Sequence, residues 1–181
     1  MLFRSRGAAP DPGSRFFLVD PLDGTKEFLK RNGEFTVNIA LIDNGAPVMG
    51  VVLAPAKARL FLGEKEMGAF ELAAPDEQTL DIARARRISA RKAPAEGLVA
   101  VASRTHRDAK TDEYLSHYRI VNLLAAGSSL KFCLVATGEA DLYPRHGRTM
   151  EWDTAAGHAR SEEHTSELQS HLNLVCRLLL E

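Results

Sequence analysis

The sequence has few cysteines, no excess of either charge and no long apolar run. Cys133 and Cys176 are too few for a framework of disulfide bonds. The net charge of -1 gives no reason to expect nucleic acid or an anionic membrane as a partner. No apolar run approaches the roughly 20 residues that a membrane-spanning helix needs. These absences favour a cytoplasmic protein in a reducing setting, and they leave open a peripheral position at the inner membrane.

The length of 181 residues and the hydrophobic content of 45% suffice for one ordinary globular domain. We place this domain at residues 16–159. Residues 1–15 include an Ala-, Pro- and Gly-rich stretch and are expected to be irregular or disordered. Residues 160–181 resemble the translation of a common sequencing adapter. We therefore expect a non-native tail there, with a genuine C-terminal helix as the alternative.

Short apolar segments separated by turn residues predict the secondary structure. In the first half they predict an antiparallel meander with strands at residues 16–19, 35–42, 47–54, 60–62 and 69–72. Asn44 and Gly45 form a hairpin signal within it. In the second half strands alternate with helices: strands at 98–102 and 120–123, and helices at 108–118, 130–137 and from about 153. Ser128 or Ser129 is expected to cap the helix over 130–137. This order predicts mixed α/β layers.

The four apolar residues at 16–19 predict a short buried strand, and the turn after it carries two carboxylates, Asp20 and Asp23, on either side of Pro21 and Leu22. Carboxylate oxygens are hard ligands that suit a divalent cation. Free backbone N–H groups at the start of a following helix attract an anion. The turn therefore suits a cation and a phosphate held together, and the alternative is an Asx-capped turn without a ligand.

Two motifs resemble those of the inositol monophosphatase superfamily. The first is Asp-Pro-Leu-Asp-Gly-Thr at residues 20–25, and the second is Trp-Asp-Thr-Ala-Ala-Gly at residues 152–157. Three further segments are similar to the bacterial 3′(2′),5′-bisphosphate nucleotidases: residues 32–40, 127–133 and 143–145. The resemblance implies a sugar-phosphatase-like α/β/α/β/α sandwich. It also implies an incomplete copy, because nothing before residue 16 matches the helical, acidic N-terminal part of the family.

The resemblance further implies the roles of individual residues. Asp20, Asp23 and Asp153, together with the Leu22 carbonyl, would hold two or three Mg²⁺ ions. Asp20, Asp23 and Thr25 would act in catalysis. Substrate contacts are implied for Leu22, Asp23, Gly24, Thr25, His106, Ser128, Lys131, Arg145 and Asp153. Four of these have plainer alternatives: a surface histidine at 106, a helix cap at 128, and solvated charges at 131 and 145.

The activity implied by the resemblance is hydrolysis of adenosine 3′,5′-bisphosphate to AMP and phosphate, a reaction linked in this family to sulfate assimilation. A small phosphomonoester is thus the expected partner, and a homodimer is left open. Two alternatives remain. One is an inositol-1-phosphate or fructose-1,6-bisphosphate phosphatase. The other is a non-catalytic remnant, since the acidic residues expected upstream of the first motif are missing.

Overall fold

The computed structural model describes residues 15–74, 80–103, 109–145 and 150–158. The strands are β1 (Phe16–Asp23), β2 (Thr36–Asp43), β3 (Ala46–Ala54), β4 (Arg59–Glu64), β5 (Gly68–Ala73), β6 (Arg86–Ile88), β7 (Leu98–Ser103) and β8 (Ile120–Ala126). The helices are α1 (Thr25–Leu29), α2 (Ala109–Ser116), α3 (Leu130–Ala136) and α4 (Glu151–His158). Two short 3₁₀ turns, η1 (Pro55–Lys57) and η2 (Ile82–Arg84), complete the list. No helix within these ranges is long and apolar enough to cross a membrane.

The predicted meander is confirmed. Strands β1 to β6 form one antiparallel sheet in which each strand pairs with the next one along the chain. Asn44 and Gly45 have φ angles of 51° and 77° and make the tight turn between β2 and β3. The prediction that all of residues 16–19 are buried is wrong, because Phe17 is 67% exposed. Successive side chains of a strand point to opposite faces, so only Phe16 and Leu18 pack against the core.

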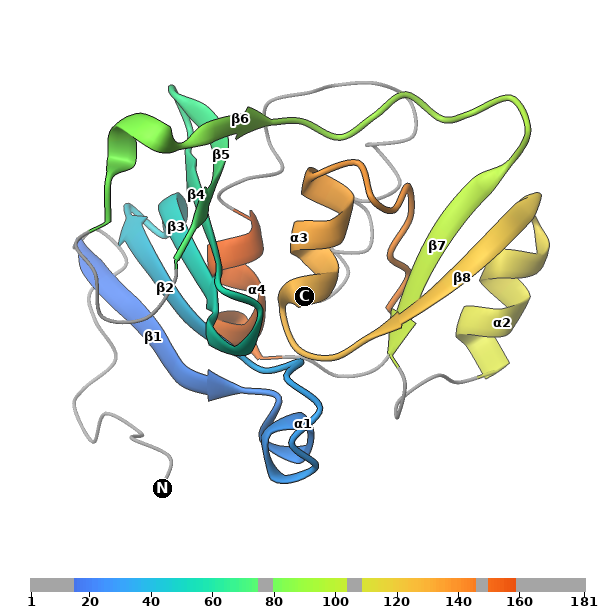
Figure 1. Cartoon of the computed structure of the whole chain (residues 1–181), viewed down its shortest axis with the longest axis horizontal. Coiled ribbons are helices and arrows are strands. Elements are labelled where there is room, and N and C mark those ends of the chain that lie inside the picture. The colour runs from blue at the N-terminus through green and yellow to red at the C-terminus, as the bar shows by residue number, and fades with distance from the viewer. Residues whose placement is uncertain (1–14, 75–79, 104–108, 146–149, 159–181) are drawn as a thin grey trace.

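The elements stack in four layers (Figure 1). Helices α3 and α4 lie between the six-stranded sheet and the parallel pair β7–β8, and α2 lies on the far side of that pair. Alternating side chains of β7 explain this arrangement: Val101 packs toward α3, whereas Leu98 and Ala100 pack toward α2. The described residues therefore provide four successive layers of the predicted α/β/α/β/α sandwich, which confirms the fold class.

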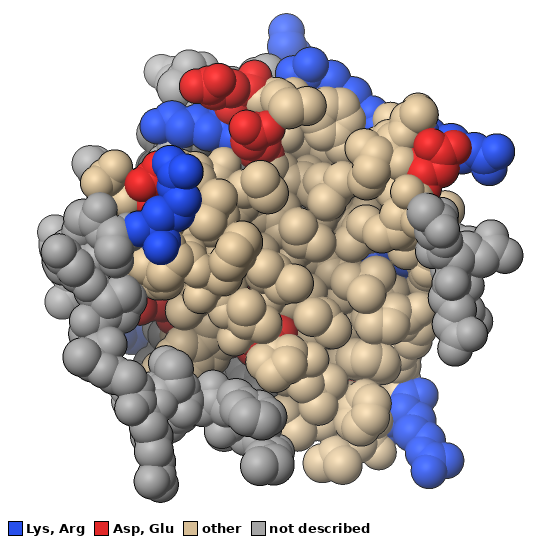
Figure 2. Space-filling model, turned by 90° about the vertical axis from the view of Figure 1, so that its left-hand side faces the viewer, with Lys and Arg blue, Asp and Glu red and all other residues tan. Residues whose placement is uncertain are grey.

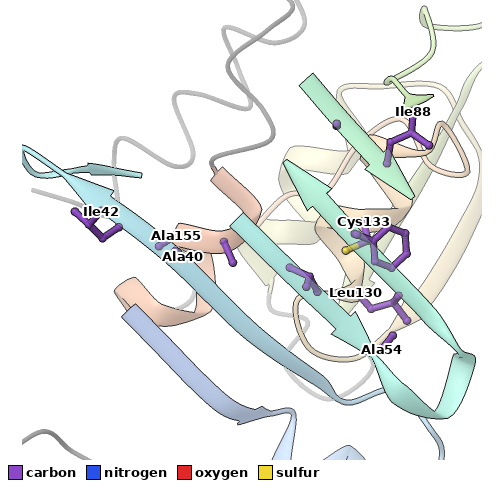
Figure 3. Close-up of a cluster of buried hydrophobic side chains, with 11 residues drawn as sticks. Ala40, Ile42, Ala54, Ile88, Leu130, Cys133 and Ala155 are labelled. Atoms are coloured by element: carbon purple, nitrogen blue, oxygen red, sulfur yellow. The ribbon is translucent and has the colours of Figure 1, made fainter. Parts of the chain in front are cut away.

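The main core lies between the six-stranded sheet and helices α3 and α4 (Figure 3). Its side chains are mostly small or aliphatic: Ala40, Ile42, Val52, Ala54, Phe61, Ala69, Ile88, Leu130, Cys133, Ala155 and Ala156. The small residues let α4 approach the sheet closely. At Gly50 of β3, an added Cβ would lie only 2.2 Å from the Ala156 carbonyl oxygen. Glycine at this position therefore fixes how α4, which carries Asp153, sits against the strands.

The opposite face of the six-stranded sheet is also apolar. The strand register brings together on this face Phe17, Val19, Ile39, Leu41, Met49, Val51, Leu62 and Phe70. Figure 2 shows this side of the molecule, where Lys, Arg, Asp and Glu lie mainly around the edge. A sheet whose strands are apolar on both faces is typical of a layer between two others.

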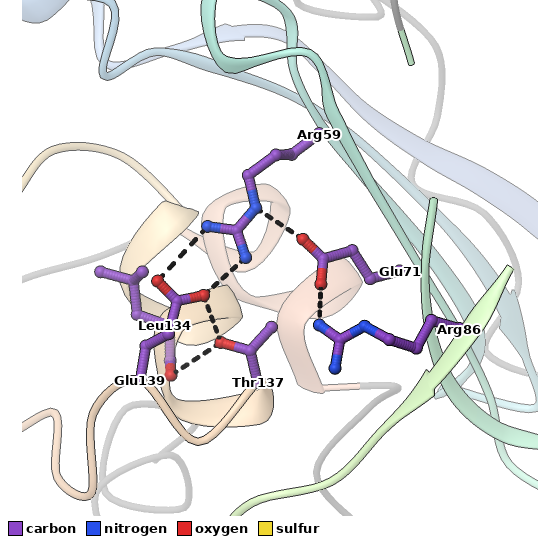
Figure 4. Close-up of polar contacts among 6 residues, drawn as sticks. All are labelled: Arg59, Glu71, Arg86, Leu134, Thr137 and Glu139. Atoms are coloured by element: carbon purple, nitrogen blue, oxygen red, sulfur yellow. Dashed lines mark hydrogen bonds and ion pairs between the residues drawn. The ribbon is translucent and has the colours of Figure 1, made fainter. Parts of the chain in front are cut away.

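An ion-pair network joins the sheet to the segment after α3 (Figure 4). Arg59 of β4 donates to Glu71 of β5 at 2.6 Å and to Glu139 at 2.6 Å. Arg86 of β6 donates to the second oxygen of Glu71, and Thr137 donates to Glu139. Because Arg59 and Glu71 are largely buried, the network holds α3 in place against β4 and β5.

Candidate functional site

The first part of the site is the end of β1. Asp20 is 8% exposed, and its Oδ1 accepts a hydrogen bond from the Leu22 backbone N–H at 3.0 Å. The pairing register with β2 shifts between Asp20 and Asp23, so both carboxylates turn toward the same region. Gly24 follows with a φ of 85°, a left-handed conformation that glycine adopts without strain. It turns the chain out of the strand and into α1.

The second part of the site is the first turn of α4. Asp153 lies there, and its Oδ2 accepts a hydrogen bond from the Met150 backbone N–H at 3.1 Å. One carboxylate oxygen from each of Asp20, Asp23 and Asp153 lies within 4.8 Å of the others. The structure therefore brings together the three aspartates that the two sequence motifs single out.

The shared position of these carboxylates affects the protonation of Asp20. The pKa of Asp20 is raised to about 6, chiefly because the carboxyl is buried and also because Asp23 and Asp153 are close. The hydrogen bond from Leu22 opposes this shift. A bound cation would relieve both the burial cost and the mutual repulsion. Three hard oxygen donors with this spacing are suited to Mg²⁺ or a similar divalent ion.

A buried set of polar groups holds Asp23. Its Oδ2 accepts hydrogen bonds from the Ser129 backbone N–H at 2.6 Å and from the Ser129 hydroxyl at 2.7 Å. Asn38 of β2, 1% exposed, donates to the Ser129 oxygen at 2.9 Å. Sequence reasoning missed both residues as part of the site. The available signal was a pair of polar residues, Thr36 and Asn38, on the buried face of an otherwise apolar strand.

The predicted capping role is corrected at Ser129. Ser129 occupies the N-cap position of α3, but its side chain makes no capping hydrogen bond. The hydroxyl oxygen instead lies 2.7 Å from Asp23 Oδ2 and 2.8 Å from the Asp153 carbonyl oxygen, and its one proton is donated to one of these two acceptors. The Ser128 hydroxyl makes a long contact of 3.4 Å with the Leu130 N–H, so it is at most a weak cap.

A cleft of about 230 Å³ opens beside the aspartates. It is lined by Asp23, Gly24, Thr25, Lys26, Glu27, Ser103, Gly127, Ser128, Ser129, Lys131, Phe132, Tyr143, Arg145 and Asp153. Six of the residues predicted to contact substrate share this cleft with Asp153: Asp23, Gly24, Thr25, Ser128, Lys131 and Arg145. His106 was also predicted to contact substrate, and it lies outside the described residues.

Lys131 is not the solvated charge that the plainer interpretation allowed. It is 4% exposed, and its Nζ donates to the Ser128 carbonyl oxygen at 2.6 Å and lies 5.4 Å from the centre of the Tyr143 ring. The pKa of Lys131 is lowered to about 8, chiefly by burial; Asp23 opposes this shift and the charge of Arg145 adds to it. The cleft thus combines an acidic end with a buried cationic side.

Comparisons with known proteins agree with this geometry. The model of the inositol monophosphatase family matches residues 5–164. The 3′(2′),5′-bisphosphate nucleotidase CysQ of Escherichia coli (strain K12) is 51% identical over 145 residues, which are 80% of this chain and 54% of that protein. CysQ of Haemophilus influenzae is 30% identical over 157 residues, 86% of this chain and 56% of that protein.

A solved structure shows the same likeness. CysQ from Bacteroides thetaiotaomicron, described as a bacterial member of the inositol monophosphatase family, superposes with a TM-score of 0.73 at 43% identity. The superposition covers 86% of this chain and 63% of that one. The chain spans about half the length of the curated relatives it matches.

Proposed function

The chain belongs to the inositol monophosphatase family, and on this premise we propose that it forms the cation- and phosphate-binding part of a Mg²⁺-dependent phosphomonoesterase. The proposed reaction is that of a 3′(2′),5′-bisphosphate nucleotidase, in which adenosine 3′,5′-bisphosphate and water give AMP and phosphate. One observation carries the proposal: Asp20, Asp23 and Asp153 converge, and Asp23 and Asp153 line the same cleft as the buried Lys131.

The acidic end of the cleft is the proposed metal site. Its donor set fits the ion, since Asp20, Asp23 and Asp153 each offer a carboxylate oxygen and the three oxygens lie within 4.8 Å of one another. The Leu22 carbonyl is the proposed fourth protein ligand. When bound, two or three Mg²⁺ ions supply a Lewis acid for the phosphoryl oxygens and lower the pKa of a water.

The residues after the carboxylates are the proposed site of the reacting phosphate. Gly24 and Thr25 line the cleft beside Asp23. In the proposal their backbone N–H groups bind the phosphoryl oxygens, and the Thr25 hydroxyl orients the attacking water. The oxygen of the attacking water forms the new P–O bond as the bond to the ribose oxygen breaks, and the proton that the water loses is taken up by that leaving oxygen. This reaction mainly requires positioning and charge neutralisation, which fixed donors and ions supply.

The cationic side of the cleft supports a substrate with two phosphates. Lys131 and Arg145 both line it, and Ser128 accepts a hydrogen bond from Lys131 and lies next to Gly24 of the first motif. We assign these three residues to the second, non-reacting phosphate and its nucleoside. Burying a cation without a bound anion costs free energy. The burial of Lys131 is therefore better explained by a role in binding an anion than by a role as a solvated surface charge.

Phosphate release from a panel of phosphomonoesters tests the proposal. The panel contains adenosine 3′,5′-bisphosphate, inositol 1-phosphate and fructose 1,6-bisphosphate, each with and without Mg²⁺, and the Asp153→Asn variant is the matched control. A preference for inositol phosphate would overturn the nucleotide assignment. If no substrate is turned over, calorimetric titration with adenosine 3′,5′-bisphosphate in Mg²⁺ distinguishes a chain that binds without catalysis from one that has no site.

A further inference from the structure

Ser129 stands at a junction of three elements that supply the proposed metal site. It precedes α3 and is 1% exposed. Its hydroxyl oxygen lies 2.7 Å from Asp23 Oδ2, at the end of β1, and 2.8 Å from the carbonyl oxygen of Asp153, in the first turn of α4. A single buried side chain therefore touches two of the three residues assigned to the cation.

The hydrogen-bond count at Ser129 is constrained. A serine hydroxyl has one proton to donate, and it accepts bonds through its lone pairs. Here the oxygen accepts from Asn38 Nδ2 at 2.9 Å, so the proton is directed to the other side, toward Asp23 or the Asp153 carbonyl. Since the side chain does not cap α3, the hydroxyl is committed to the acidic residues rather than to its own helix.

These contacts also determine which oxygen of Asp23 is available. Oδ2 accepts a hydrogen bond from the Ser129 backbone N–H at 2.6 Å and lies 2.7 Å from the Ser129 hydroxyl oxygen, with longer contacts from Asn38 Nδ2 at 3.3 Å and Thr36 Oγ1 at 3.4 Å. Donors gathered at one carboxylate oxygen fix the rotamer and leave Oδ1 as the oxygen that a cation would meet. Such bonds also offset part of the repulsion that would push Asp23 away from Asp20 and Asp153 in the absence of a cation.

We propose that Ser129 is a positioning residue that holds Asp23 and the first turn of α4 at the spacing a divalent cation requires, with Asn38 setting the direction of its hydroxyl. This inference depends on the proposed function, because it assumes that the three aspartates bind a cation. Groups that orient metal ligands in this way typically change metal affinity about 10- to 100-fold when they are removed.

The test compares Ser129→Ala with Thr111→Val, which removes another buried hydroxyl, in α2 and outside the cleft. Calorimetry gives the Mg²⁺ dissociation constant, electron paramagnetic resonance gives that of Mn²⁺, and urea unfolding without metal gives stability. We expect Ser129→Ala to raise the cation dissociation constant about tenfold or more. We expect Thr111→Val to keep it within about twofold of the wild-type value, even if both variants unfold at lower urea concentrations. Asn38→Ala should also weaken binding, and the double variant should lose less than the product of the two single losses.

Two outcomes overturn the inference and leave the proposed function intact. In the first, the wild type binds the cation and Ser129→Ala binds it with the same dissociation constant. In the second, Ser129→Ala and Thr111→Val lose equal amounts of cation affinity. The latter would mean that both act through stability alone. If the wild-type chain binds neither Mg²⁺ nor Mn²⁺, the proposed metal site fails and the positioning role fails with it. The wild-type titration therefore separates the two failures.

Discussion

Replacing Lys131 with methionine tests whether the cleft contains a strained, buried cation. The variant keeps the length of the apolar side-chain stem and removes the ammonium group. The pKa of Lys131 falls from 10.5 to about 8, chiefly through burial. At about 1.4 kcal/mol per unit of pKa shift, this lowers the free energy of unfolding at neutral pH by about 3 kcal/mol. The hydrogen bond to Ser128 and the contact with Tyr143, worth about 1 to 2 kcal/mol together, are lost in the variant.

We therefore expect Lys131→Met to be more stable than the wild type by about 1 to 2 kcal/mol at pH 7. The sign of the pH dependence follows from proton binding. Between pH 8 and 10.5 the unfolded chain binds the Lys131 proton and the folded chain does not, so wild-type stability rises with pH in this window. The advantage of the variant should be complete below pH 8 and should reverse above pH 10.5, where the burial cost has gone and the variant lacks contacts worth about 1 to 2 kcal/mol.

Urea unfolding at a series of pH values provides the measurement, with the fluorescence of Trp152, the only tryptophan in the chain, as the probe. The difference between variant and wild type is the quantity to follow, because other lysines and tyrosines titrate in the same window. Lys110→Met, at an exposed position of α2, is the control and should show no such difference. A Lys131→Met variant that is less stable at pH 7, by an amount independent of pH, would refute the reasoning.

Three further predictions concern the cation, the packing of α4 and the ion pairs. Mg²⁺ at 100 times its dissociation constant should stabilise the wild type by about 2.7 kcal/mol, and Asp153→Asn should lose most of this gain in thermal unfolding; full retention would exclude Asp153 as a ligand. Gly50→Ala places a methyl 2.2 Å from the Ala156 carbonyl oxygen, so it should lower the free energy of unfolding by about 1 to 3 kcal/mol. It should also weaken Mn²⁺ binding, because α4 has to shift. An unchanged urea midpoint would contradict the close packing. Arg59→Met breaks bonds to Glu71 and Glu139 and should cost about 1 to 3 kcal/mol, whereas the exposed Arg84→Met should cost under about 0.5; equal midpoints for the two variants would show that the network adds little.

Much of the fold could be predicted from local sequence patterns. Alternating apolar residues and the Asn44–Gly45 turn specify antiparallel neighbours, because these signals depend only on residues that are adjacent in the chain. The burial of Phe17 was predicted wrongly for the same reason. An apolar strand does not reveal which of its faces has a covering layer, since this depends on elements elsewhere in the fold.

The site was predicted in part. The aspartates stand out because each lies in a motif whose neighbours identify it. The proposed role of Ser129 could not be predicted, because a serine before a helix usually caps that helix. Only the tertiary structure brings Asp23 and Asn38 to its hydroxyl. The burial of Lys131 was likewise invisible, as a lysine on a short helix is normally exposed and only Tyr143 and the surrounding cleft exclude water from it.

The site joins segments far apart in the chain, since Asp23 and Ser129 are 106 positions apart. The contacts between β1, α3 and α4 therefore close a long loop. Closing it costs more conformational entropy than closing the short loops of the hairpins in the meander. An ion shared by Asp20 and Asp153 would act as a non-covalent staple on this loop. A chelator that removes the ion would then also weaken the packing of α4 on the sheet and leave the hairpins intact. Amide hydrogen exchange should therefore become faster in α4 before it does in β2 and β3.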